Sequence, residues 1–327
     1  MNNKPIIIIA GEPYSVFLEI FFKTLKSKEI KLIKSPIIII ASKENLIKQM
    51  KKLNFFFKIR LVDRELLNIK SINNNSINLI DVKFSFNKVF DKISKKSNNY
   101  ISECFKLGLN LMKKKKAKGL LNGPISKKDF LSSKFPGITE YLASKTNRRG
   151  KEVMLIYNKN LSVSTVTTHL PLKNIFKEIT KSKIIKNITT VDHFYKKILN
   201  KKPKIAVCGL NPHCESGNKN NEEKKIIIPA IKSVSKKIKV SGPYATDTLF
   251  IKKNVNKFDV VLGMYHDQVL TPIKTLYQFD AINITLGLPF IRVSPDHGTN
   301  NQMLGKNKSD PTSLKKSLIF LDKNSVS

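Results

Sequence analysis

Short apolar runs alternate with amphipathic stretches along the first 125 residues of the chain. The run at 5–10 (PIIIIA) has the composition of a buried strand, and it precedes apolar residues at helical spacing, Phe17, Phe21 and Leu25. The same hexapeptide recurs at 36–41, ahead of a second helical pattern near 43–53. Strands that alternate with helices are typical of an α/β fold with a mainly parallel sheet, and we expect that class here.

The pattern changes in the middle of the chain. Runs at 152–157 (EVMLIY) and 161–168 (LSVSTVTT) flank the tripeptide NKN, a spacing that predicts an antiparallel hairpin. Two further runs, at 204–210 and 259–264, have the composition of buried strands, and each precedes a loop that contains a histidine. The remaining predicted helices lie at about 91–114, 172–186, 191–199 and 312–321.

No low-complexity linker divides the chain, although 327 residues are enough for two lobes. Residues 54–90 are the least regular part, and the run GLL at 119–121 leads into the turn NGP. Any division must therefore be made by segments that cross between lobes, near 125–130 and 285–290. We expect one lobe from residues 1–127 plus 286–327 and another from residues 128–285.

The net charge of +36 raises the alternative of a nucleic-acid-binding protein. Of the 60 basic residues, however, only five are arginine, the side chain best suited to paired hydrogen bonds with phosphates and guanines. The lysines are spread along the whole chain, as a compositional bias would place them. We therefore expect no nucleic-acid partner, and we expect the charge to steer anionic substrates.

Membrane and disulfide-stabilised classes are also disfavoured. No apolar stretch approaches the roughly 18 to 20 residues that a membrane span needs, and the run at 5–10 is too short for the core of a signal peptide. We therefore expect no membrane partner and a cytoplasmic location. Cys104, Cys208 and Cys214 are too few and too scattered for a disulfide framework.

Three of the five histidines share one context, a predicted strand that enters a polar turn. They are His169 in TVTTHLP, His213 in GLNPHCESG and His266 in GMYHDQ. Open α/β sheets bind ligands at the carboxyl ends of their strands, and neutral imidazoles are good ligands for zinc and other first-row divalent ions. The pattern indicates a catalytic metal site, although spacings of 44 and 53 residues match no short zinc signature.

Other candidate residues carry weaker signals. His193 lies in a helical stretch beside core-type residues, which favours a structural role, whereas His297 in PDHGTN fits either a structural turn or a nucleotide-binding loop. Arg292 emerges from the apolar run LPFIRV, where a buried cation needs an anionic partner. Asp247 in YATDTLF is best explained as a helix N-cap, and Lys274 by itself as one more solvated lysine.

The usual nucleotide-binding fingerprints do not occur in the sequence. The first predicted strand is followed by GEPYSV rather than by G-x-G-x-x-G, and no GKS or GKT is present for a phosphate-binding P-loop. A nicotinamide cofactor would therefore be held in another way than in the usual Rossmann fold.

The motifs together resemble the 4-hydroxythreonine-4-phosphate dehydrogenase family of pyridoxal phosphate biosynthesis. Residues 14–117 add little to the resemblance beyond GEP at 11–13. The similar stretches run in order through the rest of the chain: NGPISK (122–127), GITEYL (137–142), TTHLPL (167–172), VCGLNPHCESG (207–217), GPYATDTLF (242–250), MYHDQ (264–268), NITLGLPFIRVSPDHGT (283–299) and GKNKSD (305–310).

The resemblance implies a two-lobed fold like that of isocitrate and isopropylmalate dehydrogenases, distinct from the usual Rossmann fold. Residues 1–127 and 286–327 would form the cofactor-side lobe, and 128–285 the lobe for metal, substrate and dimer contacts. It also implies a homodimer with its active site at the lobe and subunit interface. A divalent zinc, magnesium or cobalt ion would be held there by His169, His213 and His266.

The implied reaction uses NAD or NADP to oxidise the C3 hydroxyl of 4-phosphohydroxy-L-threonine, and decarboxylation then gives 3-amino-2-oxopropyl phosphate. Proton transfer would fall to Lys274 or Asp247, which the resemblance does not separate. The remaining roles that it implies are substrate binding by Thr139, Lys274, Asn283 and Arg292, and cofactor binding by His297, Gly298 and Thr299.

Two departures from the family pattern bear on substrate and packing. The stretch GITE has Ile138 where the family form has histidine, which removes a polar contact to the substrate. A four-carbon phosphorylated aldonate, erythronate or threonate 4-phosphate, is therefore an alternative substrate. The glycine-rich continuation of GEP is replaced by bulkier residues at 14–17, for which we expect local repacking. A metal-binding remnant without catalysis is a further alternative.

Overall fold

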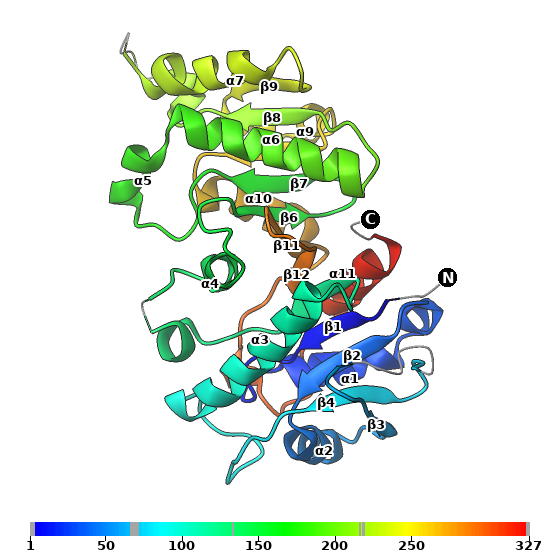
Figure 1. Ribbon diagram of the computed structural model, residues 1–327. Helices are drawn as coiled ribbons and strands as arrows, with labels where there is room; N and C mark the ends of the chain where they lie inside the picture. The colour runs from blue at the N-terminus through cyan, green and yellow to red at the C-terminus, as the bar shows by residue number, and fades with distance from the viewer. Residues whose placement is uncertain (1–3, 66–71, 133, 216, 218–219, 325–327) are drawn as a thin grey trace. The chain divides into compact units, whose positions relative to one another are not determined.

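The computed structural model describes residues 4–65, 72–132, 134–215, 217 and 220–324 (Figure 1). The chain forms two compact units, the first from residues 1–141 and 290–327 and the second from residues 142–289. Strands alternate with helices in both units, and most strand pairs are parallel. The predicted α/β class with a mainly parallel sheet is therefore confirmed. The assignment of cofactor and substrate roles to two lobes stays a prediction.

The first unit is built on parallel strands in the order β3-β4-β2-β1-β5-β12. All side chains of β1 and β2 are buried. Helices cover both faces of such a sheet, so each face needs apolar residues, which explains the uninterrupted isoleucine runs. The strands are β1 (Ile6–Ile9), β2 (Ile37–Ala41), β3 (Ile59–Leu61), β4 (Ile77–Asp81), β5 (Gly119–Asn122) and β12 (Arg292–Pro295).

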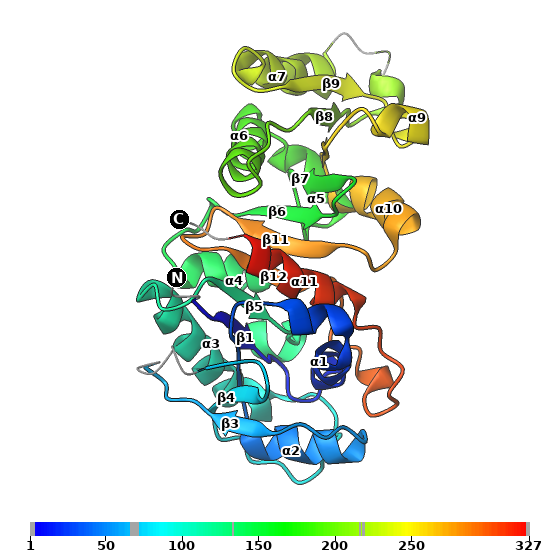
Figure 2. The ribbon, with the colours of Figure 1, turned by 90° about the vertical axis from the view of Figure 1, so that its right-hand side faces the viewer.

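Four helices lie wholly within the first unit: α1 (Phe17–Lys26), α2 (Lys43–Lys52), α3 (Asn98–Lys113) and α11 (Thr312–Lys323). The helix α3 packs on β1, β2 and β5, whereas α11 packs on β12, β5 and β1 and contacts α1. Figure 2 shows α3 on one side of the sheet and α1 with α11 on the other. The helix expected at 91–114 begins only at Asn98, because a 3-10 turn, Lys95–Ser97, precedes it.

The second unit holds strands in the order β11-β6-β7-β10-β8-β9. The strand β6 is antiparallel to both β7 and β11, which confirms the predicted hairpin. The strands β7, β10, β8 and β9 are parallel to one another. Their bounds are β6 (Val153–Tyr157), β7 (Ser162–Thr165), β8 (Ile205–Cys208), β9 (Val240–Tyr244), β10 (Val260–Gly263) and β11 (Ile282–Leu286).

For one pair of helices in the second unit, the predicted position of the break between them is wrong. Instead of helices at 172–186 and 191–199, the chain forms α5 (Leu172–Glu178) and an unbroken α6 (Lys181–Ile198). The hydroxyl of Thr180 accepts a hydrogen bond from the Lys183 N–H at 3.3 Å, which caps α6. Ile188 and Val191 are both buried, and their burial favours one continuous helix across the predicted break in spite of β-branched residues there.

The other helices of the second unit are short, apart from α10. They are α7 (Ile228–Val234), α8 (Thr246–Leu249), α9 (Lys252–Val255) and α10 (His266–Tyr277), and α4 (Ile138–Lys145) enters the unit from the first. In the ranges that the structure describes, none has the length and hydropathy needed to cross a bilayer.

The loop after β1 is repacked with large side chains, as its sequence predicts. Tyr14 and Phe17 are both buried, and the Tyr14 ring meets Phe84 edge-on with centroids 5.7 Å apart. The chain can turn there because Gly11 adopts φ +78°, and a Cβ on this residue would lie 2.4 Å from the carbonyl oxygen of Pro124. The loop after β1 is thus held tightly against the turn after β5.

Glu12, in the same loop, is a buried carboxyl group. Its Oε1 accepts from the Tyr14 N–H at 3.2 Å, and its Oε2 accepts from the Ser97 hydroxyl at 3.0 Å. Burial raises the pKa of Glu12 to about 7; the charge of Asp129 adds to this rise, and the two hydrogen bonds oppose it. A raised pKa means that the folded state favours the protonated acid. The contribution of Glu12 to stability is therefore full below pH 4.5 and is lost as pH rises through about 7.

The free energy of unfolding of Glu12→Gln is expected to rise relative to that of the wild type as the pH increases. The difference should grow by roughly 2 to 3 kcal/mol from pH 4.5 to pH 8. Glutamine stays neutral, and its amide can donate to the Ser97 hydroxyl while that hydroxyl donates to the Ser94 carbonyl, 3.0 Å away. Urea unfolding at both pH values measures the gain. The exposed carboxylate variant Glu44→Gln is the control, and a gain for Glu12→Gln that does not grow with pH would contradict the assignment.

Candidate functional site at the carboxyl ends of three strands

Three neighbouring parallel strands of the second unit end at one edge of the sheet. The strand β10 lies between β7 and β8 and pairs with both in parallel. His169 follows β7, His213 follows β8, and His266 follows β10 as the first residue of α10. The expected strand-end context of the three histidines is therefore present, and the fold places those strand ends side by side.

The structure brings two of these histidines together. The ring centroids of His169 and His266 are 5.9 Å apart. His266 Nδ1 also lies 2.6 Å from Asp267 Oδ1, a hydrogen bond that fixes one ring nitrogen and leaves Nε2 for another partner. The His266 side chain is 36% exposed.

His213 stands on a differently shaped loop. Its backbone is left-handed, with φ 54°, and its side chain is 78% exposed. Nδ1 of His213 lies 3.6 Å from Oδ2 of Asp247, in the first turn of α8. Asp247 is not the N-cap favoured by the sequence, because Ala245 holds that position, and its carboxylate faces an imidazole instead.

The loop that carries His213 is anchored by Glu223, a carboxylate only 1% exposed. Oε1 of Glu223 accepts from the N–H groups of Leu210 and Asn211, at 2.7 and 2.8 Å. Burial acts to raise the pKa of Glu223, but the hydrogen bonds from Asn211 and Leu210 outweigh it, so the pKa lies below its ordinary value. The anchor is therefore a carboxylate at neutral pH.

The donor chemistry of this edge suits a divalent ion, but the described residues of one chain do not gather a full set of ligands. Imidazole and carboxylate groups are the usual ligands of zinc and cobalt. Within the described ranges, no three histidine, cysteine, aspartate or glutamate side chains lie close enough together to hold a metal ion. The geometry provides the pair His169 and His266, with His213 beside Asp247 on the neighbouring strand end.

Two more of the predicted site residues belong to the second unit. Lys274 lies on α10, with Nζ 6.0 Å from the centre of the Phe279 ring. Asn283 lies on β11, opposite Ile156 of β6, and is half-buried.

Arg292 and Thr139 belong to the first unit. Arg292 begins β12 and is fully buried, and its Nε donates to Asn122 Oδ1 at 2.7 Å. Burial lowers the pKa of Arg292 to about 9, and the charge of Glu140 acts in the opposite sense, so the guanidinium stays cationic at neutral pH. The sequence prediction of a buried Arg292 is confirmed. Thr139 lies on α4, next to Ile138, the first residue of that helix.

The loop with His297, Gly298 and Thr299 is attached to the loop after β1. The Val16 N–H donates to the Thr299 carbonyl at 3.1 Å. His297 Nδ1 lies 2.9 Å from the Gly298 carbonyl, so the ring turns back on its own loop. This attachment joins two segments that are nearly three hundred residues apart in the sequence, and no local sequence pattern signals it.

Glu19 extends this attachment to the stretch GKNKSD. Its carboxylate is 2% exposed and accepts from the N–H groups of Asn307 and Ser309, at 3.2 and 2.7 Å. Lys23 donates to the carbonyl groups of the same two residues, each at 2.9 Å. Sequence reasoning missed Glu19 and Lys23, because an acidic and a basic residue four apart on a helix usually form a solvated pair.

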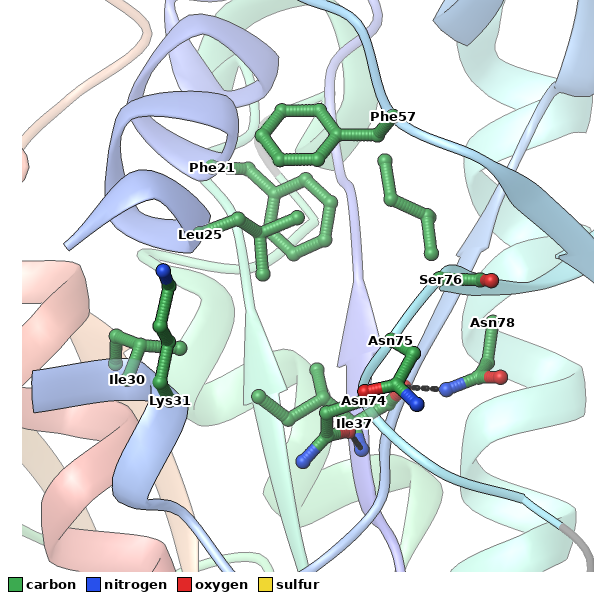
Figure 3. Close-up of a pocket in the computed structure, with 11 residues that line it drawn as sticks. Phe21, Leu25, Ile30, Lys31, Ile37, Phe57, Asn74, Asn75, Ser76 and Asn78 are labelled. Carbon is green, nitrogen blue, oxygen red and sulfur yellow. Dashed lines mark hydrogen bonds between the residues drawn. The ribbon is translucent and has the colours of Figure 1, made fainter. Parts of the chain in front are cut away.

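In the first unit, a pocket of about 440 Å³ lies at the amino-terminal ends of β2 and β4 (Figure 3). Phe21, Leu25 and Phe57 form its apolar wall, and asparagines at 74, 75 and 78 form its polar rim. None of the residues predicted for catalysis, substrate or cofactor lines it. The pocket therefore gives no support to a site at that end.

The fold and the strand-end histidines define an α/β enzyme with its functional groups on loops at a sheet edge. The family model of the pyridoxal phosphate biosynthetic protein PdxA matches residues 33–320. A 4-hydroxythreonine-4-phosphate dehydrogenase of Sulfurihydrogenibium sp. is 40% identical over 319 residues, 94% of each chain. The D-threonate 4-phosphate dehydrogenase of Salmonella typhimurium is 31% identical over 319 residues, 95% of this chain and 96% of that one.

Solved structures agree with these relatives. The crystal structure of 4-hydroxythreonine-4-phosphate dehydrogenase from Klebsiella pneumoniae superposes with a TM-score of 0.83 at 28% identity, and the match covers 97% of this chain and 98% of that one. The chain belongs to the PdxA family and is a dehydrogenase. The family resemblance predicted from the sequence motifs is confirmed.

Proposed function

We propose that the protein oxidises 4-phosphohydroxy-L-threonine at its C3 hydroxyl with NAD or NADP, and that the product loses carbon dioxide to give 3-amino-2-oxopropyl phosphate. The observation that carries the proposal is the 40% identity to a 4-hydroxythreonine-4-phosphate dehydrogenase across 94% of both chains. The placement of His169, His213 and His266 at adjacent strand ends supports it.

In this proposal the three histidines hold a divalent zinc, magnesium or cobalt ion in a homodimer whose two subunits both contribute. Such an ion supplies positive charge next to an oxygen of the substrate. Two imidazoles of one chain lie together and the third stands apart, an arrangement that suits a site completed by a second copy. A cytoplasmic location is proposed together with this biosynthetic role.

The protein's own residues would bind the anion and move the proton. Arg292 and Lys274 provide positive charge for the phosphate or carboxylate, and Thr139 and Asn283 provide hydrogen bonds. A nicotinamide cofactor would supply the acceptor for the hydride of C3, and Asp247 or Lys274 would take the hydroxyl proton. Loss of carbon dioxide would leave the electrons of the broken bond on the adjacent carbon, and a proton from Asp247 or Lys274 would add there to give the ketone. His297, Gly298 and Thr299 would receive the adenosine part of the cofactor.

A second candidate substrate, threonate or erythronate 4-phosphate, is favoured by one residue. Ile138 starts α4 next to Thr139, where the family form has a histidine. An apolar side chain there removes a polar contact, and a substrate without the amino group would lose less by the change. The 31% identity to the D-threonate 4-phosphate dehydrogenase of Salmonella typhimurium supports this alternative.

Formation of NADH from three substrates would test the proposal. We expect kcat/KM for 4-phosphohydroxy-L-threonine to exceed that for threonate and erythronate 4-phosphates by at least about tenfold, roughly 1.4 kcal/mol of transition-state binding. The variant Ile138→His serves as a matched comparison and should widen the preference. Turnover of an aldonate phosphate without turnover of the amino acid would contradict the first substrate and establish the second.

A further inference from the structure

Gln268 lies where the loops after several strands of the second unit meet. It is the third residue of α10 and only 8% exposed. His266 stands two positions earlier on the same helix, and residues two apart on a helix point to different sides. The Gln268 amide is therefore turned inward, beneath the edge that presents His266 to solvent.

The Gln268 amide makes three hydrogen bonds, which use one acceptor and both donors. Oε1 accepts from the Met264 N–H at 2.7 Å, and Nε2 donates to the Gly209 carbonyl at 2.7 Å and to the Thr246 hydroxyl at 3.0 Å. A backbone N–H can only donate and a carbonyl can only accept. The orientation of the amide is therefore fixed, and no other side chain of this length supplies one acceptor and two donors.

The three partners come from different strand ends, each next to a predicted site residue. Met264 directly follows β10 and lies two residues before His266, and Gly209 directly follows β8 and lies four residues before His213. Thr246 precedes Asp247 on α8. One buried amide thus fixes the spacing between the loops that carry His266, His213 and Asp247.

A fourth loop is joined through the backbone of the same residue, Met264. The Met264 carbonyl accepts from the Thr167 hydroxyl at 2.8 Å, two residues before His169. The approach of α10 to its strand depends on Gly263, where a Cβ would lie 2.6 Å from Val269 Cγ1 and 3.2 Å from Gln268 Oε1. The absence of a side chain at Gly263 therefore leaves the space in which the Gln268 side chain reaches the loop after β10.

We propose that Gln268 is a positioning residue, which sets the distances between His169, His213, His266 and Asp247 without touching substrate or metal. This inference rests on the proposed function in one respect, that the histidines bind a divalent ion. Groups behind metal ligands typically change metal affinity by about tenfold to a hundredfold when they are removed. The same loss is expected here, because methionine in place of Gln268 would leave three loops free to separate.

The test measures binding of cobalt(II) to the folded full-length protein by its visible absorption, together with kcat and KM. Gln268→Met is expected to weaken cobalt affinity by about tenfold to a hundredfold and to lower kcat. The control is Tyr195→Phe, which removes a buried 2.8 Å hydrogen bond to Ser162 at the start of β7, the other end of the same sheet. It should lose stability and keep its cobalt affinity within about twofold.

A milder variant tests the same role if Gln268→Met does not fold. Thr246→Val removes one of the three hydrogen bonds and should weaken cobalt affinity by about threefold, the effect of a single neutral hydrogen bond. If both Gln268→Met and Thr246→Val bind cobalt as tightly as the wild type, the positioning role is wrong and the metal site stands. If the wild type itself binds no cobalt and no other divalent ion, the proposed metal function fails, and this inference fails with it.

Discussion

Alanine at His213 is expected to remove the bound divalent ion and to lower turnover by at least about a thousandfold, roughly 4 kcal/mol of transition-state stabilisation. The side chain is 78% exposed, so its loss should change the folded core little. Metal content of the purified protein and NADH formation measure the two effects. A variant that keeps both would contradict the metal role of the strand-end histidines.

The backbone at His213 calls for a second variant. A left-handed residue with φ 54° disfavours alanine by about 1 kcal/mol, whereas asparagine tolerates that conformation. His213→Asn should therefore keep the loop and still lose metal and turnover. His193→Ala is the matched control, since His193 lies exposed on α6 and should affect neither.

Methionine at Arg292 is expected to lower kcat/KM by about a thousandfold, because two charge-assisted hydrogen bonds to a phosphate or carboxylate are worth roughly 4 kcal/mol together. Arg292→Lys keeps the charge but loses the Nε–H bond to Asn122, so it should retain an intermediate activity. Steady-state kinetics at saturating cofactor would separate the three proteins.

A control for Arg292 must separate local binding from the long-range attraction of a protein with net charge +36. Arg149→Met removes an equal charge from an exposed loop and should change kcat/KM by less than about twofold. Equal losses in Arg149→Met and Arg292→Met would show that Arg292 acts only through the overall field. Urea unfolding should accompany the kinetics, because Asn122 Oδ1 loses its buried donor in Arg292→Met.

Much of the fold was predictable wherever buried strands carry uninterrupted apolar runs. The strands β1, β2, β6, β8 and β10 follow from such runs, and β7, with the alternating sequence SVST, completes the predicted hairpin with β6. The strand β4 was missed, because its sequence INLID contains a buried Asn78 that no apolar pattern reveals. The Asn78 amide is accommodated by donating to the carbonyl groups of Ile37 and Asn73, contacts that a sequence pattern does not show.

The sequence predicted that the site residues follow strands, but it did not predict which of these strands are neighbours in the sheet. Three histidines after strands were visible in the sequence, but the adjacency of β7, β10 and β8 comes from the topology of the whole unit. Gln268, Glu223 and Glu19 act through buried hydrogen bonds to distant backbone groups. Such partners leave no local signature, because any backbone N–H or carbonyl can serve.

His193 is exposed although its neighbours in the sequence are buried. Neighbouring core residues suggested a structural role for it, but in α6 it falls on the exposed face between buried Val191 and Phe194. Because an α-helix has 3.6 residues per turn, the side chain next to a buried one points in a different direction and can face solvent. Adjacency in sequence is therefore poor evidence of burial on a helix.

The discontinuous first unit has a consequence for the order in which the chain becomes structured during synthesis. Its strand β5 has an unpaired edge until β12 has been made, and α11, which packs on β12, β5 and β1, is made only after the second unit. The second unit, residues 142–289, is one continuous stretch. It can be complete while the first unit still exposes an open strand edge and bare isoleucine surface, features that invite association with other chains. The first unit is thus begun before the second unit and can be completed only after it.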